Sequence, residues 1–290
     1  MTLGCHGAGG VAGGKRVVER WREGRGAEKY SHTYARRMKI EPFRTTHARF
    51  DAVLCDIDGC LTPESSTPLD LHALGIIAEH NRRAQRDRDR PLLTLCTGRP
   101  QPFAEALTRL LANVTLPLVA ENGVWLYQPG ANLYEMDPAI TREHRAAVRE
   151  AAAWLESNFG PHGVTQQPGK SASVSLYHPE PAYLREICPA IEAQFAQAHW
   201  PMRVSMTWFY INCDLKHISK ASGLKRLLAT TGLSRERCAG IGDTPSDQAI
   251  RDNVAFFACP ANADERIKAV ADFVAGGSEA AGVVEILGRL

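Results

Sequence analysis

The sequence predicts an α/β fold in which a parallel sheet carries helices on both faces and a smaller α+β domain is inserted. Three observations lead to this prediction. Short apolar runs alternate with helical segments toward both ends of the chain body, polar residues end several of these runs, and the middle of the chain follows a different pattern. Strands connected through helices form right-handed crossovers, which place the strands side by side in a parallel sheet.

The elements of the predicted core begin at residue 50. Apolar runs typical of buried strands cover residues 50–58, 91–98, 116–123, 238–243 and 252–260. Segments of helical character cover residues 69–84, 103–111, 217–233 and 262–274, and the last of these closes with a short strand. Together they predict a Rossmann-like core, in which ligands bind at the carboxyl ends of the strands.

The middle of the chain predicts a separate domain. Helices are expected at residues 141–157 and 181–196, and the stretches SASVSLYHP and MRVSMTWFYINC alternate in the manner of strands. We therefore predict a catalytic core formed by residues 50–128 and 215–290. Residues 129–214 are predicted to form a cap domain that selects the substrate.

The first 49 residues are expected to be a disordered basic extension, because they are rich in Gly and Arg and lack a sustained apolar period. They hold 11 basic and 4 acidic residues, whereas the rest of the chain has a net charge of −5. The pI of 8.1 therefore gives no support for nucleic-acid binding, and none is expected. The heptapeptide GGVAGGK lacks the preceding strand and following hydroxyl of a nucleotide loop. Because Met38 stands close to the first strand, it stays open whether residues 1–37 belong to the native protein.

The composition is that of an ordinary globular chain, with 44% hydrophobic and 23% charged residues. No apolar run approaches the roughly 18 residues that a membrane-spanning helix needs, so no membrane partner is expected. The eight cysteines are scattered singly, which favours free thiols in a reducing compartment over disulfides or zinc. A cytoplasmic protein is therefore expected.

Polar side chains stand where the predicted strands end. Asp56 and Asp58 follow the first strand, Thr97 follows the second, Asp243 ends the run CAGIGD, and Asp247 comes one helical turn later. The carboxyl ends of parallel strands share one edge of the sheet, so these side chains are expected to lie together. Four carboxylates at one edge make a hard-oxygen cluster that fits Mg²⁺.

Together with Lys220, which opens a predicted helix, these motifs resemble those of the haloacid dehalogenase superfamily of phosphatases: DxD, Thr/Ser, Lys and GDxxxD in this order. The resemblance covers about residues 50–290. Between Asp58 and Thr97 lie 38 residues, and between Thr97 and Lys220 lie 122, so the cap must follow the second motif. This resembles the Cof-type and sucrose-phosphatase-like branch with its large α+β cap, as do the phrases TGRP, ENG, SKASGLKRLL and NADERIKAVADFV.

The resemblance implies a role for each motif residue. Asp56 would attack phosphorus and form an aspartyl-phosphate, and Asp58 would protonate the leaving group and then activate water. Lys220 would hold Asp56 and one phosphoryl oxygen, while Thr97 and the backbone N–H of Gly98 would hold another. The implied ligands of Mg²⁺ are Asp56, Asp243, the backbone carbonyl of Asp58, and Asp247 directly or through water.

Other residues are candidates for the phosphate or the rest of the substrate. The branch usually has Asn where this chain has Ser246, whose hydroxyl can still hydrogen-bond over a shorter reach. Arg99 could bind substrate or pack at the helix start, and Asn122 could face the cap hinge. Lys170 and His162 could meet a carboxylate or sugar hydroxyls, or be a solvated lysine and a loop histidine.

We therefore expect a Mg²⁺-dependent phosphoric monoester hydrolase that acts on a small phosphorylated metabolite through an aspartyl-phosphate intermediate. A sugar phosphate and a phosphoglycolate-like ester are both compatible with the sequence. Two alternatives stay open: a phosphomutase of the same branch, and a catalytically silent binding protein that uses the same pocket. The physiological substrate and the oligomeric state do not follow from the sequence.

Overall fold

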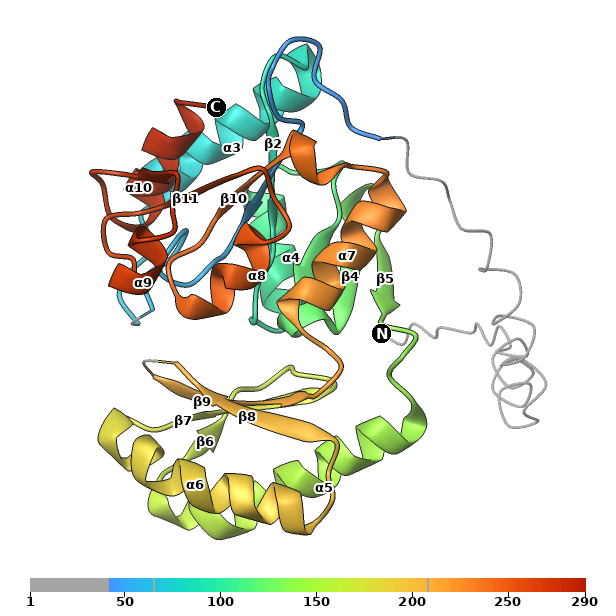
Figure 1. Cartoon of the computed structure of the whole chain (residues 1–290), viewed down its shortest axis with the longest axis vertical. Coiled ribbons are helices and arrows are strands. Elements are labelled where there is room, and N and C mark those ends of the chain that lie inside the picture. Colours follow the sequence, from blue (N-terminus) through green and yellow to red (C-terminus); the bar gives the residue numbers. More distant parts are fainter. Residues whose placement is uncertain (1–41, 65, 208) are drawn as a thin grey trace, which may run out of the picture. The chain divides into compact units, whose positions relative to one another are not determined.

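The computed structural model describes residues 42–64, 66–207 and 209–290, and the central sheet of this part of the chain is parallel (Figure 1). Its five strands stand in the order β12-β11-β10-β1-β2. Their bounds are β1 (Ala52–Cys55), β2 (Leu92–Leu95), β10 (Cys238–Ile241), β11 (Phe256–Cys259) and β12 (Phe273–Val274). Strand β1 pairs in parallel with both β10 and β2, so its carboxyl end opens between two neighbouring strand ends. The α/β fold predicted from the sequence is confirmed.

Helices cover both faces of this sheet because β1 is apolar on both sides. Val53 and Cys55 belong to one buried apolar cluster, and Ala52 and Leu54 belong to another. Successive strand side chains point to opposite faces, so the two clusters lie on the two faces of the sheet. The first cluster includes side chains of α3 (Leu71–Asp87), α4 (Gln101–Leu110) and α10 (Glu279–Leu287). The second includes side chains of α7 (Lys220–Thr231), α8 (Gln248–Arg251) and α9 (Glu265–Lys268).

A three-stranded antiparallel sheet follows β2 and α4 in the chain. It is formed by β3 (Leu118–Ala120), β4 (Trp125–Gln128) and β5 (Leu133–Met136). The apolar run 116–123, predicted as a strand of the parallel core, provides β3. It joins that core through an isolated parallel bridge between Cys96 and Val119 rather than through a continuous strand ladder. Which strands pair with each other depends on contacts between residues far apart in the sequence. The local apolar pattern therefore could not distinguish β3 from the strands of the parallel sheet.

The middle of the chain forms a four-stranded antiparallel sheet with two long helices on one face (Figure 1). Its strands are β6 (Thr165–Gln166), β7 (Ser173–Tyr177), β8 (Met202–Met206) and β9 (Tyr210–Leu215), in the order β6-β7-β9-β8. The helices are α5 (Arg142–Phe159) and α6 (Pro181–Gln197), which share a third buried apolar cluster with β7 and β9. We keep the division into core and cap at residues 129–214 as a proposal.

Alternation along β7 and β9 gives this sheet one apolar and one polar face. Val174 and Ile211 belong to the apolar cluster under the helices, whereas Ser175 and Asn212 line a cavity on the other side. Period-2 alternation is the pattern of a strand with one face packed on a core and the other open to solvent or ligand. The polar face of this sheet is therefore available to a ligand.

Short 3₁₀ helices connect several elements: η1 (Glu121–Gly123), η2 (Pro129–Ala131), η3 (Gly160–His162), η4 (Arg235–Arg237) and η5 (Pro245–Asp247). Residues 1–41 of the predicted extension lie outside the described residues. Residues 42–49 pack on the core, because Phe43 is buried in the second apolar cluster and Arg44 pairs with the buried Asp51 at 3.0 Å. None of the helices in the described ranges is long and apolar enough to cross a membrane.

Candidate active site

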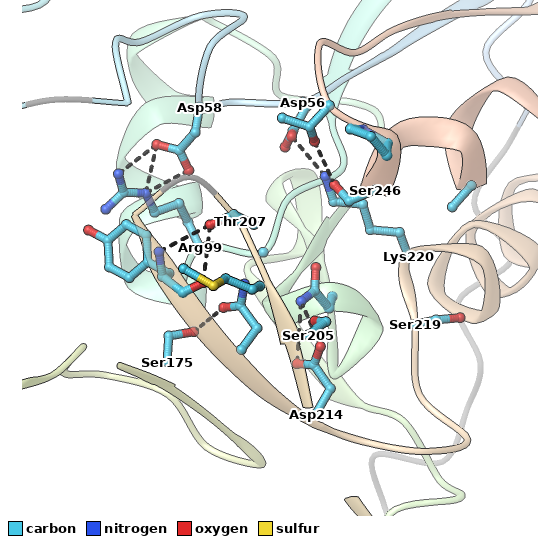
Figure 2. Close-up of a pocket in the computed structure, with 18 of the residues that line it drawn as sticks. Asp56, Asp58, Arg99, Ser175, Ser205, Thr207, Asp214, Ser219, Lys220 and Ser246 are labelled. Atoms are coloured by element: carbon cyan, nitrogen blue, oxygen red, sulfur yellow. Dashed lines mark hydrogen bonds and ion pairs between the residues drawn. The ribbon is translucent and has the colours of Figure 1, made fainter. Parts of the chain in front are cut away.

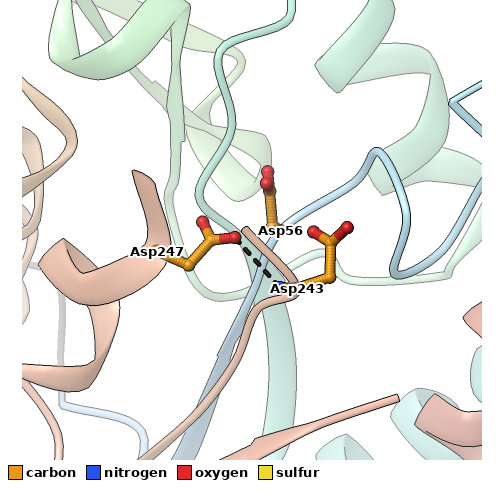
Figure 3. A group of neighbouring side chains, drawn as sticks. All are labelled: Asp56, Asp243 and Asp247. Atoms are coloured by element: carbon orange, nitrogen blue, oxygen red, sulfur yellow. Dashed lines mark hydrogen bonds between the residues drawn. The ribbon is translucent and has the colours of Figure 1, made fainter. Parts of the chain in front are cut away.

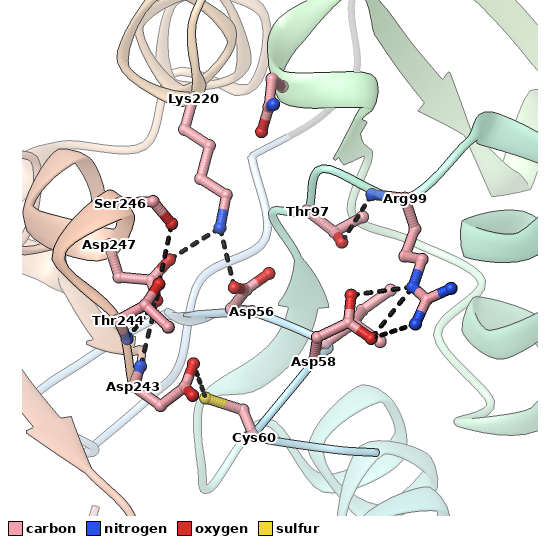
Figure 4. Close-up of polar contacts among 12 residues, drawn as sticks. Asp56, Asp58, Cys60, Thr97, Arg99, Lys220, Asp243, Thr244, Ser246 and Asp247 are labelled. Atoms are coloured by element: carbon pink, nitrogen blue, oxygen red, sulfur yellow. Dashed lines mark hydrogen bonds and ion pairs between the residues drawn. The ribbon is translucent and has the colours of Figure 1, made fainter. Parts of the chain in front are cut away.

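The loop after β1 carries Asp56 and Asp58 at the carboxyl end of the parallel sheet (Figure 4). The carbonyl of Ile57 accepts hydrogen bonds from the backbone N–H groups of residues 60, 61 and 62, which makes the loop tight. Gly59 has a φ of +73°, and a Cβ there would stand 1.9 Å from Oδ2 of Asp243. A glycine is therefore favoured here both by the positive φ of the turn and by the close approach of the Asp243 carboxylate.

Lys220 connects the loop of β1 with that of β10. Its Nζ lies 2.8 Å from Oδ2 of Asp56 and 2.7 Å from Oδ1 of Asp247, and the three side chains are at most 7% exposed. Ser219 caps helix α7 by accepting a hydrogen bond from the backbone N–H of Ser222, which fixes Lys220 in the first turn. Burial opposes the charge of the ammonium, but Asp247 and Asp56 outweigh it and raise the pKa of Lys220 well above its ordinary value.

Three carboxylates gather beside this ammonium (Figure 3). Asp56, Asp243 and Asp247 each offer an oxygen, and these oxygens lie within 4.8 Å of one another. Burial raises the pKa of Asp56 to about 8, with a further contribution from the charge of Asp247. Burial also raises the pKa of Asp243 to about 9, and repulsion by Asp247 and Asp56 adds to it. One ammonium is thus too little positive charge for three buried carboxylates.

The same cluster has the donors that a hard divalent cation prefers. Oδ1 of Asp56 is buried and has no hydrogen-bond partner among the described residues. Oδ2 of Asp247 accepts hydrogen bonds from the backbone N–H groups of Asp243 and Thr244, which orient its carboxylate. All three groups offer oxygen only, and Mg²⁺ is bound in proteins through carboxylates and water. These residues therefore fit Mg²⁺.

Asp58 points toward Arg99 rather than toward Lys220 (Figure 4). Nε of Arg99 donates to Oδ1 and Oδ2 of Asp58 at 2.9 and 2.8 Å. Arg99 begins the turn into α4, where its backbone N–H donates to Oγ1 of the buried Thr97 at 3.0 Å. The guanidinium occupies both oxygens of Asp58 in this conformation, so a role as proton donor requires the pair to open.

The cavity at the polar face of the middle sheet has a volume of about 460 Å³ (Figure 2). Eight of the residues singled out in the sequence line it: Asp56, Asp58, Gly98, Arg99, Asn122, Lys170, Lys220 and Ser246. Thr97, Asp243 and Asp247 are buried next to these residues and are not part of the cavity wall. The hydroxyl of Ser246 lies 2.9 Å from that of Thr244. His162 is exposed and does not line the cavity.

Several residues of the cavity wall were not identified from the sequence. The middle sheet contributes Ser175, Arg203, Tyr210, Asn212 and Asp214, and the loop after β1 contributes Glu64. The alternation along β7 and β9 is the signal that could have found Ser175, Asn212 and Asp214, because it places them on the face opposite the apolar residues. Which face meets the core is a tertiary property that the alternation does not contain.

Comparison with known proteins places this geometry in a family. Residues 133–287, more than half of the chain, match the haloacid dehalogenase-like hydrolase family. The phosphoglycolate phosphatase of Sulfolobus acidocaldarius is 24% identical over 243 residues, which cover 82% of this chain and 95% of the relative.

Two solved structures have the same fold. A HAD/COF-like hydrolase from Plasmodium vivax has a TM-score of 0.65 at 17% identity, covering 84% of this chain and 96% of that chain. The sucrose-phosphatase from Synechocystis, solved with sucrose and phosphate, has a TM-score of 0.59 at 15% identity, covering 83% of this chain and 98% of that chain. The resemblance to the Cof-type branch is confirmed, and the chain belongs to the haloacid dehalogenase-like hydrolases as a phosphatase of that family.

Proposed function

We propose that this protein is a Mg²⁺-dependent phosphatase that hydrolyses a small phosphorylated metabolite through an aspartyl-phosphate intermediate at Asp56. The observation that carries the proposal is the state of the Asp56 carboxylate. It lies on the wall of the cavity, one of its oxygens is held by Lys220, and the other is buried without a partner among the described residues. A buried carboxylate in this state is arranged to meet an electrophile or a cation.

Mg²⁺, when bound, would neutralise the phosphate charge that otherwise repels an attacking carboxylate. The residues that would hold it are Asp56, Asp243 and Asp247, whose oxygens lie within 4.8 Å of one another. Asp58 could contribute through its backbone carbonyl, as the family resemblance implies.

The chain's own residues account for the transfer of the phosphoryl group. A carboxylate oxygen of Asp56 forms a bond to phosphorus while the bond from phosphorus to the leaving oxygen breaks. Asp58 gives that oxygen a proton, and then takes a proton from the water that attacks the aspartyl-phosphate. This second displacement releases orthophosphate and restores the Asp56 carboxylate. Lys220, Thr97 and the N–H of Gly98 would hold phosphoryl oxygens in both steps.

Arg99 controls the availability of Asp58 in this proposal. The guanidinium must leave the Asp58 carboxylate before this side chain can carry a proton to the leaving group. Arg99 also lines the cavity, so a substrate oxygen could replace Asp58 as its partner. Substrate binding and release of the acid would then be a single event.

A short phosphorylated acid is one candidate substrate, because several relatives are named phosphoglycolate phosphatases. A sugar phosphate, which the sequence also allows, is another. Two other functions would use the same cavity. A phosphomutase would return the phosphoryl group to the substrate, and a binding protein would carry out no chemistry.

The test is turnover of a generic phosphate ester, p-nitrophenyl phosphate, by the wild type and by Asp56→Asn in the presence of Mg²⁺. The substitution is expected to lower kcat by at least about 1,000-fold, because it removes the nucleophile and keeps the shape of the side chain. Undiminished turnover by the variant would refute the nucleophile assignment. Orthophosphate release measured beside isomer formation on hexose phosphates separates a phosphatase from a phosphomutase, and absence of turnover by the wild type would favour a binding protein.

A further inference from the structure

Lys170 is a cation of the cavity wall that has no anionic partner. Among the residues that the structure describes, no hydrogen bond or ion pair is formed by its ammonium, although the side chain is mostly buried. The other cations of the wall are paired: Lys220 with Asp56 and Asp247, Arg99 with Asp58, and Arg203 with Asp214. A buried charge without a partner is costly, so a ligand is the expected source of the missing anion.

The two carboxylates nearest to Lys170 are already engaged. Glu121 accepts hydrogen bonds from the backbone N–H groups of Ser171 and Ala172, both at 2.8 Å, and from the hydroxyl of Ser173 at 2.8 Å. Asp214 accepts hydrogen bonds from Nδ2 of Asn122 and pairs with Arg203 at 3.4 Å. Burial lowers the pKa of Lys170, and the nearby charges of Asp214 and Glu121 only oppose that shift.

These contacts also fix the position of Lys170. Glu121 belongs to η1, which directly follows strand β3, and its carboxylate binds the segment 171–173 that comes immediately after Lys170. Gly169, on the other side of Lys170, has a φ of +87° and lies close to Pro100 at the start of α4. The backbone on the carboxyl side of Lys170 is therefore anchored to Glu121, and the backbone on its amino side lies against Pro100.

We propose that Lys170 binds a carboxylate of the substrate, so that the substrate class is a phosphate monoester with a carboxylate at the end away from the phosphate. This inference rests on the proposed phosphatase function and adds a second anionic group to its substrate. An ammonium is a compact charge that suits a carboxylate. The wall of the same cavity also carries the neutral side chains Ser175, Asn212 and Tyr210, which can hydrogen-bond a polar substrate. A sugar phosphate without a carboxylate would leave Lys170 unpaired.

The test compares two esters of equal length: 2-phosphoglycolate and ethylene glycol monophosphate, which has a hydroxymethyl group in place of the carboxylate. The wild type is expected to prefer 2-phosphoglycolate. Lys170→Met should lower kcat/KM for 2-phosphoglycolate by about 10- to 100-fold and change it by less than about 3-fold for the neutral ester. Lys216→Met, at an exposed lysine that is not part of the cavity wall, is the matched control and should leave both values unchanged.

The possible outcomes separate this inference from the proposed function. If the wild type hydrolyses neither ester and no generic ester, the proposed function fails. Two results would overturn the role of Lys170 and leave the phosphatase function intact. In the first, Lys170→Met lowers kcat/KM equally for both esters. In the second, the wild type prefers the neutral ester. The melting temperature of Lys170→Met without substrate controls for folding. It should equal or exceed that of the wild type, because an unpaired buried charge is removed; a large decrease would show that Lys170 serves the fold.

Discussion

Replacing Lys220 by Met should destabilise the fold through a charge effect whose size follows from the site. The ammonium lies 2.8 Å from Asp56 and 2.7 Å from Asp247, and the third carboxylate, Asp243, belongs to the same cluster. Removing one partner of a buried ion pair costs about 3–5 kcal/mol, because the remaining charge is left uncompensated. For a chain of this size that loss corresponds to a decrease in melting temperature of roughly 6–20 °C without metal.

The pH dependence of this loss has a definite sign. Asp56 and Asp243 have raised pKa values, about 8 and about 9, so between about pH 4 and these values the folded state holds more protons than the unfolded state. Stability must therefore decrease as the pH rises through this window, by up to about 1.4 kcal/mol per pH unit for each proton of difference. The pKa of Lys220 is raised, so its ammonium stays charged throughout the window and its stabilising contribution is present there.

Without Lys220 the carboxylates should hold their protons to still higher pH. We expect the loss of stability in Lys220→Met to be smaller at pH 5, where Asp56 and Asp243 hold their protons in both proteins. The loss should grow as the pH rises through about 8 to 9, where the wild type releases these protons and the variant keeps them. The measurement is thermal and urea unfolding in EDTA across this range. Lys225→Met, at an exposed position of the same helix, is the control and should change stability by less than about 0.5 kcal/mol at each pH.

A Lys220→Met protein that unfolds within about 1 kcal/mol of the wild type at pH 8.5 would refute the reasoning. It would mean that solvent or the rest of the chain neutralises the cluster without the ammonium. A loss of equal size at pH 5 and pH 8.5 would contradict the electrostatic cause and point to lost packing instead.

Two further predictions concern the proposed metal site. Mg²⁺ at about 100 times its Kd should raise the free energy of unfolding of the wild type by about 2.7 kcal/mol, which is roughly 5–10 °C in melting temperature. Asp243→Asn should lose most of this shift, because it removes one of the three clustered carboxylates. Without metal, this variant should be at least as stable as the wild type at pH 8.5. A shift that survives in Asp243→Asn would place the ion elsewhere. Gly59→Ala should lower kcat by at least about 10-fold and weaken the Mg²⁺ shift, because its Cβ would stand 1.9 Å from an oxygen of Asp243. Gly75→Ala, whose Cβ meets nothing within 4 Å in helix α3, is the control and should keep full activity.

The sequence predicted the site residues that directly follow a buried strand. Asp56 and Asp243 follow apolar runs that became β1 and β10, and these two strands are neighbours in the sheet. Their proximity could therefore be predicted from the strand pattern alone, because parallel strands bring their carboxyl ends to one edge. Lys220 could be placed beside them only through the family resemblance, since nothing in its local pattern distinguishes it from a solvated lysine.

The sequence did not predict contacts between segments that lie far apart in the chain. Glu121 stands in the turn-forming sequence ENG, which indicates an irregular backbone, and its φ of +50° agrees with that. Its partners are 50 to 52 residues away, so no local pattern could show that it binds the segment after Lys170. The pairing of Arg99 with Asp58 is equally non-local. No local pattern could therefore show that Arg99 occupies the carboxyl group of the proposed proton donor.

Oδ1 of Asp56 and the ammonium of Lys170, each without a partner among the described residues, have opposite charge, so the cavity can distinguish the two ends of a substrate. The free oxygen of Asp56 lies in the loop after β1 and can meet a cation or an electrophile. The ammonium of Lys170 lies in the segment before β7 and can meet an anion. If both proposals hold, a substrate with a phosphate at one end and a carboxylate at the other satisfies both groups in one orientation only. In the reversed orientation the carboxylate would face Asp56, and carbon in a carboxylate is a poor electrophile. Discrimination between the two ends would then come from the chemistry at Asp56, while Lys170 would supply the binding energy that holds the phosphate in place.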